Sequence, residues 1–158
     1  MRCTNVQVRY CVGMMTCVAA VITLTLAAAA GERPALIVAG AEAPVRMDRA
    51  AVLTPAEGPP VVLYAATNLT DQALDQFTVM AFVFKADGTL KARQVAPGRH
   101  MLDPRETKYS TLVLDGSAVE PTDVIVVGIN QAQRVGSDAW WRADLQPAAE
   151  AAVPLHKR

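Results

Sequence analysis

His100 is the residue best suited to acid–base chemistry in this chain, because an imidazole titrates near neutral pH. A catalytic triad also needs a nucleophile and an acid within its reach. Asp103 follows His100 closely, but Ser110 and Ser117 both lack the G-x-S-x-G context that exposes a nucleophilic serine. The other histidine, His156, belongs to a C-terminal segment with the composition of a disordered tail. We therefore expect no catalytic residue, and a small periplasmic enzyme that uses His100 is the alternative.

Metal-binding side chains are scattered along the sequence. The soft ligands that would suit exported copper are His100, Met101, Met47 and Met80. Only His100 and Met101 are adjacent in the sequence. Asp71 and Asp75 are four residues apart, but they lack the dense set of oxygen ligands that calcium requires. We expect no metal site and no cofactor, and a metal carrier that uses His100 is the alternative.

The adjacent pair Trp140 and Trp141 is the candidate binding site. Consecutive residues of a strand face opposite sides of the sheet, so one indole is expected to enter the core and the other to face outward. An exposed tryptophan is a common anchor of a protein interface. The alternative is that the outward ring covers the edge of the sheet or packs under the N-terminal arm.

The charges of the chain argue against nucleic acid as a partner. The sequence of 158 residues has 15 Lys+Arg and 15 Asp+Glu, so its formal net charge is zero. Between Arg33 and Arg142 the basic residues are scattered singly, and none of them form a patch that could follow a phosphate backbone. We expect a protein partner, which includes the case of a homo-oligomer, and no nucleic acid.

Residues 1–30 have the organisation of a secretory signal peptide. Two arginines precede an uncharged apolar run that ends in four alanines, and the small residues there permit cleavage before Ala30 or Gly31. The alternative is an uncleaved anchor, since the run from Cys11 onward is about long enough to cross a bilayer. We expect a periplasmic or secreted protein that contacts a membrane only if this leader is retained.

All three cysteines lie within residues 1–30. The rest of the chain therefore has no disulfide, no thiolate metal site and no redox dithiol. It is long enough for one domain with its own core. Packing and backbone hydrogen bonds must hold this domain together.

Short segments rich in β-branched and aromatic residues, separated by turn formers, run through the chain after the leader. With no convincing helical period, they predict an all-β fold, a single antiparallel immunoglobulin-like β-sandwich. The expected strands are Ala35–Ala39, Val45–Leu53, Val61–Thr67, Phe77–Lys85, Leu90–Ala96, Thr107–Asp115, Val124–Gln131 and Trp140–Leu145.

Composition divides the chain into four parts. The signal peptide (1–30) is followed by an Ala- and Pro-rich arm with room for one edge strand (31–60). The sandwich core (61–146) comes next, and a flexible C-terminal tail (147–158) ends the chain.

The turn at Asp87 and Gly88 sets the register of one hairpin. A three-residue loop of residues 86–88, with Gly88 in the left-handed region, pairs Phe84 with Leu90. A two-residue loop would set aromatic residues opposite charged ones, because a one-residue slip exchanges the two faces of a strand. The hydrophobic pattern therefore favours the three-residue loop.

This register also predicts which face of the strand is buried. Phe82 pairs with Ala92, and Met80, Phe82 and Phe84 point into the core. The other face of this strand is apolar too, and so are both faces of Val124–Gln131. An outer sheet face is normally wet and more polar, so these strands either have a covered outer face or expose a docking patch.

Three segments carry a family resemblance: LYAATN at 63–68, FTVMAFVFKADGTL at 77–90, and LDPRET at 102–107, before an apolar strand. Over about residues 61–131 the chain resembles the small bacterial extracytoplasmic immunoglobulin-like domains of the FxLYD type. In those domains a strand of alternating apolar residues ends in an acidic-glycine turn, and a proline-containing loop precedes the next strand. The resemblance implies a fold and an envelope location, but fold alone does not imply function.

Taken together, these features predict an exported, non-catalytic binding or assembly module of the bacterial cell envelope. Its expected partner is an unidentified envelope protein. The alternative is a small periplasmic enzyme or metal carrier that depends on His100.

Overall fold

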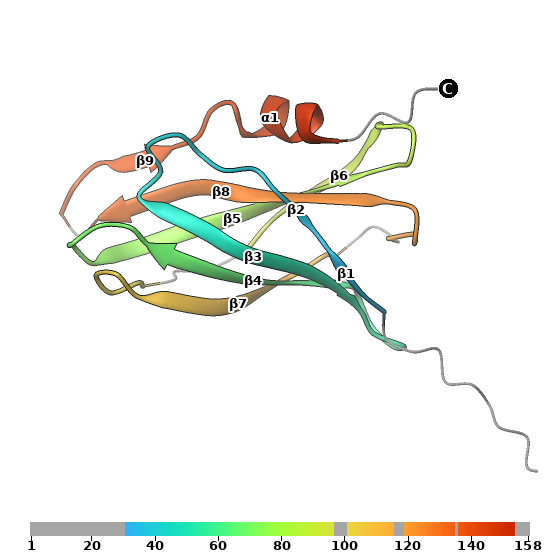
Figure 1. Cartoon of the computed structure of the whole chain (residues 1–158), viewed down its shortest axis with the longest axis horizontal. Coiled ribbons are helices and arrows are strands. Elements are labelled where there is room, and N and C mark those ends of the chain that lie inside the picture. The colour runs from blue at the N-terminus through green and yellow to red at the C-terminus, as the bar shows by residue number, and fades with distance from the viewer. Residues whose placement is uncertain (1–30, 97–100, 116–118, 135, 154–158) are drawn as a thin grey trace, which may run out of the picture.

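The computed structural model describes residues 31–96, 101–115, 119–134 and 136–153, and within them the chain folds as a two-layer β-sandwich (Figure 1). The elements in chain order are β1 (Gly31–Pro34), β2 (Leu36–Ile37), β3 (Val45–Thr54), β4 (Val61–Asn68), β5 (Leu74–Phe84), β6 (Leu90–Val95), β7 (Thr107–Val113), β8 (Val124–Arg134), β9 (Ala139–Trp141) and α1 (Leu145–Ala152).

The strands form two sheets. The four-stranded sheet has the order β1-β3-β4-β7, and the five-stranded sheet has the order β2-β8-β5-β6 with β9 also paired to β8. All pairs are antiparallel except β2 with β8. The chain crosses between the two sheets after β1, β2, β4, β6 and β7. The predicted all-β sandwich is confirmed.

Residues 31–60 take a larger part in the sandwich than the sequence predicted. Instead of an arm with one edge strand, they supply β1, β2 and β3. β3 lies between β1 and β4 inside the four-stranded sheet, and Val45, Met47, Ala50 and Val52 are buried in the core. Residues 31–60 are therefore part of the sandwich. β3 matches the expected strand Val45–Leu53, whereas β1 was not among the expected strands.

The hairpin between β5 and β6 has the predicted three-residue loop. The Gly88 N–H donates to the Lys85 carbonyl at 2.9 Å, and the Lys85 N–H donates to the Thr89 carbonyl at 2.9 Å. Gly88 has φ +86°, the left-handed region that glycine adopts without strain. Asp87 stabilises the turn by accepting a hydrogen bond from the Thr89 N–H at 2.9 Å. Phe84 pairs with Leu90, as expected.

One step further along this hairpin the predicted register is wrong. Val83 pairs with Ala92, so Lys91 is an extra residue on β6, and Phe82 pairs with Arg93 instead of Ala92. Such a bulge bends the strand and redirects a side chain. Here it sends the Lys91 ammonium to the carboxylate of Asp123, at 2.9 Å.

Phe82 and Phe84 are fully buried, as predicted, but they do not lie in the core between the two sheets. That core receives the opposite face of β5: Phe77, Val79, Ala81 and Val83. Phe82 and Phe84 stack at a centroid distance of 6.3 Å on the outer side of the sheet, and Met80 is partly buried beside them. The predicted burial was correct, and the predicted location was not.

The cover over these rings is α1, which corrects the expectation of a flexible tail over 147–158. Leu145, Ala149 and Val153 are buried and lie four residues apart, which places them along one stripe of a helix. They pack on Phe82, Phe84 and Val126. In Figure 1 the helix lies on the side of β8 away from β7. The apolar outer face of this sheet is thus a covered face, while residues 154–158, with His156, lie outside the described residues.

Candidate binding face

The outer face of the four-stranded sheet is the surface opposite α1, and no described element covers it. Strand alternation sends every second side chain of its strands outward. Three rows of outward residues cross the sheet: Glu32, Leu53, Val61 and Val113; then Pro34, Ala51, Leu63 and Thr111; then Arg49, Ala65 and Tyr109. Most of these side chains are apolar, so we call this surface the outer face and treat it as a candidate binding site.

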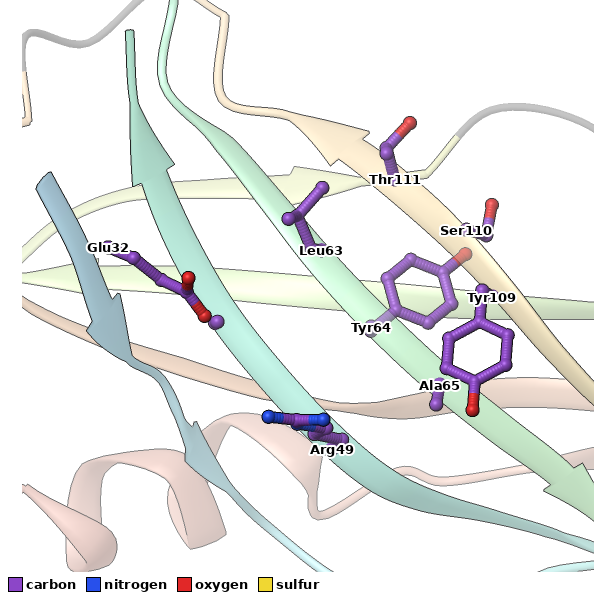
Figure 2. Close-up of a pocket in the computed structure, with 9 residues that line it drawn as sticks. Glu32, Arg49, Leu63, Tyr64, Ala65, Tyr109, Ser110 and Thr111 are labelled. Atoms are coloured by element: carbon purple, nitrogen blue, oxygen red, sulfur yellow. The ribbon is translucent and has the colours of Figure 1, made fainter. Parts of the chain in front are cut away.

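A hollow of about 420 Å³ lies at the centre of the outer face (Figure 2). Its floor is low because Ala51 and Ala65 carry only methyl groups. Leu63, 37% exposed, rises beside them from β4, and the Tyr109 ring stands beside Ala65 from β7. Tyr109 is 81% exposed. Tyrosine is one of the residue types that contribute most to the binding free energy of protein interfaces.

Two opposite charges stand on the β1 and β3 side of the hollow. Glu32 comes from β1 and Arg49 from β3, and both side chains line the hollow (Figure 2). Both residues are exposed, and within the described part of the chain neither forms an ion pair or a side-chain hydrogen bond. They are therefore available to charged groups of a partner.

Glu32 is held on this face by its neighbour Arg33. Arg33 points to the other side of β1, where its guanidinium donates to the backbone carbonyls of Asp123, Pro121 (3.2 Å) and Glu120 (3.1 Å). The Asp123 side chain is buried and accepts from the Glu120 N–H at 2.8 Å and from Lys91. These bonds fasten β1 to the loop before β8.

Asn68, at the end of β4, helps to place β7 beside β4. This side chain is fully buried, and its Nδ2 donates to the carbonyls of Gln72 (2.8 Å), Asp103 (3.0 Å) and Leu102 (3.3 Å). Its Oδ1 accepts from the Thr70 N–H at 2.9 Å and from the Thr70 hydroxyl at 2.8 Å. One side chain thus joins the loop after β4 to the segment that leads into β7, which carries Tyr109.

A polar group of side chains lies at the start of β3 and the end of β4. Asp48 accepts hydrogen bonds from Arg46 at 2.5 Å and from the Thr67 hydroxyl, and Thr67 also contacts the Thr107 hydroxyl at 2.6 Å. Burial acts to raise the pKa of Asp48, but the bonds from Thr67 and Arg46 and the Arg46 charge hold it below its ordinary value. The Asp48 carboxylate therefore already has hydrogen-bond and charge partners within this chain.

One hydroxyl group at the hollow, that of Tyr64, belongs to a buried side chain. Burial raises the pKa of the Tyr64 phenol, which the Ser110 hydroxyl opposes only in part, so this group stays protonated at neutral pH. In the described parts of the chain, no group of three or more His, Cys, Asp or Glu residues is placed to hold a metal ion. The arrangement is suited to binding an apolar surface with two charges at its margin.

The tryptophan pair lies elsewhere, on β9 at the edge of the five-stranded sheet. Trp140 and Trp141 face opposite ways, as predicted: Trp140 packs against the core, and Trp141 is 62% exposed. The segment before β3 touches the inner ring, since a Cβ on Gly40 would lie 3.3 Å from Trp140 Cη2. Only Trp141 is therefore available to a partner, and it shares no surface with the hollow.

The three methionines among the candidate soft ligands lie in different parts of the described structure. Met47 is buried between the sheets, Met80 lies under the helix side of β5, and Met101 is 59% exposed. His100, the residue of the enzyme and metal-carrier alternative, lies outside the described residues. Ser110 is on β7, beside the Tyr64 hydroxyl, and both histidines of the chain lie outside the described residues.

Sequence reasoning did not single out the outer face. A signal was present, because Val61, Leu63 and Ala65 alternate with Val62, Tyr64 and Ala66 as apolar residues on both sides of β4. Recognising the hollow also requires that β7 pairs with β4 and that β1 pairs with β3, which are contacts between strands far apart in the sequence.

In the described residues, no helix has the length and hydropathy needed to cross a bilayer. Comparisons of the chain with protein-family models, with characterised proteins and with solved structures give no significant match.

Proposed function

We propose that this protein is an exported, non-catalytic binding or assembly module of the bacterial cell envelope, and that it binds a protein partner through the outer face of the four-stranded sheet. The observation that carries the proposal is an asymmetry between the two sheets. The apolar outer face of the five-stranded sheet is covered by α1, whereas no described residue covers the apolar outer face of the four-stranded sheet, where Tyr109 is 81% exposed.

Physical chemistry supports this use of the face. Exposed apolar area is unfavourable in water, and an extended patch of it on a soluble domain marks an interaction site. The centre of the outer face is apolar, while charged and polar groups stand at its margin, which is the usual layout of a protein interface. The leader-like segment at residues 1–30 supports an envelope location.

The experiment compares three substitutions in cells that produce the full chain. Tyr109→Asp places a charge on the outer face, Trp141→Asp places one on the exposed indole site, and Val95→Asp is a matched control on the edge strand β6, where Val95 is 40% exposed. The measured quantity is the size of the complex that contains the protein in gently solubilised envelope fractions.

We expect Tyr109→Asp to release the protein from its complex and Val95→Asp to leave the complex intact. Circular dichroism of each purified variant verifies that it is folded. If Tyr109→Asp behaves as the control and Trp141→Asp releases the protein, the binding site belongs on β9 and not on the outer face. Loss of the biological role in His100→Ala alone would favour the enzyme or metal-carrier alternative.

A further inference from the structure

We infer that the partner on the outer face is a second copy of this chain, docked face to face about a twofold axis. The inference rests on the proposed function, because it needs the outer face to be a binding surface, and it adds the identity of the partner. What carries it is the placement of Glu32 and Arg49 on either side of the central row of the hollow.

The strand register gives the positions of these two charges. Glu32 pairs with Leu53, and Arg49 precedes Leu53 by four residues on β3, so the two charges are roughly 13 Å apart along the strands. The row of Ala51 and Leu63 crosses the sheet midway between them. In the direction across the strands the charges differ by one strand, about 4.8 Å, which long side chains span easily.

A twofold axis along this middle row makes the outer face complementary to itself. The rotation reverses the direction along the strands, so Glu32 of one copy faces the partner's Arg49, and Arg49 faces the partner's Glu32. In the same dimer Leu63 meets the partner's Leu63 near the axis, and Tyr109 meets the partner's Val113, which lies two rows away on the same strand. One interface thus uses both charges twice and covers the exposed apolar side chains, as an isologous contact does.

The other twofold arrangement, with its axis parallel to the strands, is electrostatically worse. It exchanges β1 with β7 within each row, so Glu32 would face the partner's Val113 and be covered without a counter-charge. Covering a carboxylate against an apolar surface is unfavourable. The axis across the strands is therefore the one that the charges select.

The size of the face indicates how strong the contact is. Four strands at about 4.8 Å and seven residues of β7 at about 3.4 Å define a surface of roughly 450 Å² per copy, or roughly 900 Å² for the pair. Stable complexes bury more, and weak reversible ones are near this size. The dimer is therefore a reversible one whose population depends on concentration.

Sedimentation velocity over a wide concentration range tests the inference, with the protein purified as cells produce it. The wild-type protein should pass reversibly from monomer to dimer. Glu32→Arg and Arg49→Glu should each weaken the dimer by about tenfold or more, because each places like charges opposite each other twice. Glu150→Arg, on the exposed side of α1, changes the charge equally and should have no effect.

Mixing provides the decisive measurement. In an equal mixture of Glu32→Arg and Arg49→Glu, a dimer with one copy of each variant has an opposite charge at every contact, so dimerisation should return to near the wild-type level. No such recovery is expected if the two substitutions weaken the protein by misfolding. A mixture that stays monomeric would overturn the assigned axis, and a wild-type protein that stays monomeric at every concentration would overturn the second copy as the partner.

The outcomes also separate this inference from the proposed function. A protein that is monomeric when purified, but is still released from a larger envelope complex by Tyr109→Asp, retains the binding face and has a different partner. If the purified protein is monomeric and Tyr109→Asp does not change the size of its envelope complex, the outer face has no binding role and both proposals fail.

Discussion

Substituting Gly128 probes the contact between α1 and the five-stranded sheet. Gly128 lies on β8 directly beneath the helix, and an added Cβ would be 2.6 Å from Leu145 Cδ1 and 3.2 Å from the Val38 carbonyl oxygen. The first separation is too short for carbon atoms, so Leu145 must move. Overpacking of this kind costs about 1–3 kcal/mol. We expect Gly128→Ala to lower the free energy of unfolding by that amount.

Leu145→Ala provides the second arm of a double-mutant cycle. Leu145 is 2% exposed, and truncation of a buried leucine costs about 2–5 kcal/mol. In this background the new methyl group at position 128 no longer meets a leucine side chain and keeps only the 3.2 Å approach to the Val38 carbonyl oxygen, so Gly128→Ala should cost less. The two changes should therefore be less than additive, by about 1–2 kcal/mol.

Urea unfolding followed by circular dichroism measures these free energies. Thr111→Ala, on the opposite sheet, is the control and should be additive with Leu145→Ala. Hydrogen exchange of the Ala148 amide, which donates to the Asp144 carbonyl at 3.0 Å, reports on the helix itself, because eight residues are too few for a stable isolated helix. If Gly128→Ala costs the same in both backgrounds, Leu145 does not pack on Gly128 and the described cover is wrong.

Three further predictions concern the leader, the hairpin and the pH dependence. N-terminal sequencing of the extracytoplasmic protein should find Ala30 or Gly31, and an intact Met1 on a membrane-bound protein would contradict cleavage. Gly88→Val should lower the free energy of unfolding by roughly 1–2 kcal/mol or more, because a β-branched residue resists a φ of +86°; an unchanged urea midpoint would contradict this. The lowered pKa of Asp48 stabilises the fold above the ordinary aspartate pKa of about 3.9, and this contribution is lost as the pH falls through the lower folded value. Asp48→Asn should therefore make the free energy of unfolding less dependent on pH in that acid range. If its pH dependence there is unchanged, the Asp48 bonds contribute nothing to stability.

Most of the strands were predictable because each is marked by its own side chains and bounded by turn formers. β1 (Gly31–Pro34) was not predicted, and the strand expected over Trp140–Leu145 ends at Trp141, since Leu145 begins α1. The hairpin loop at Gly88 could also be deduced, since one choice of loop kept Phe84 opposite an apolar residue. The bulge at Lys91 could not. It is stabilised by Asp123, 32 residues later, and nothing near Lys91 in the sequence reveals that partner.

The helix α1 was detectable but was missed. Leu145, Ala149 and Val153 are spaced as one helical stripe, yet Pro147 and the alanines around it have the composition of a tail. The deciding information is the apolar outer side of β5 and β8, which needed a cover. The candidate site was less predictable still, because the hollow depends on which strands pair.

Photo-cross-linking in living cells can show which face of the domain contacts its partner. A photoreactive phenylalanine analogue replaces Tyr109 on the outer face, and in separate strains Trp141 or Val95. We expect efficient adducts from position 109 and none above background from position 95, with a twofold-symmetric self-adduct if the partner is a second copy. Adducts from position 141 alone, or none from position 109 in folded protein, would contradict the claim that this domain binds through its four-stranded sheet.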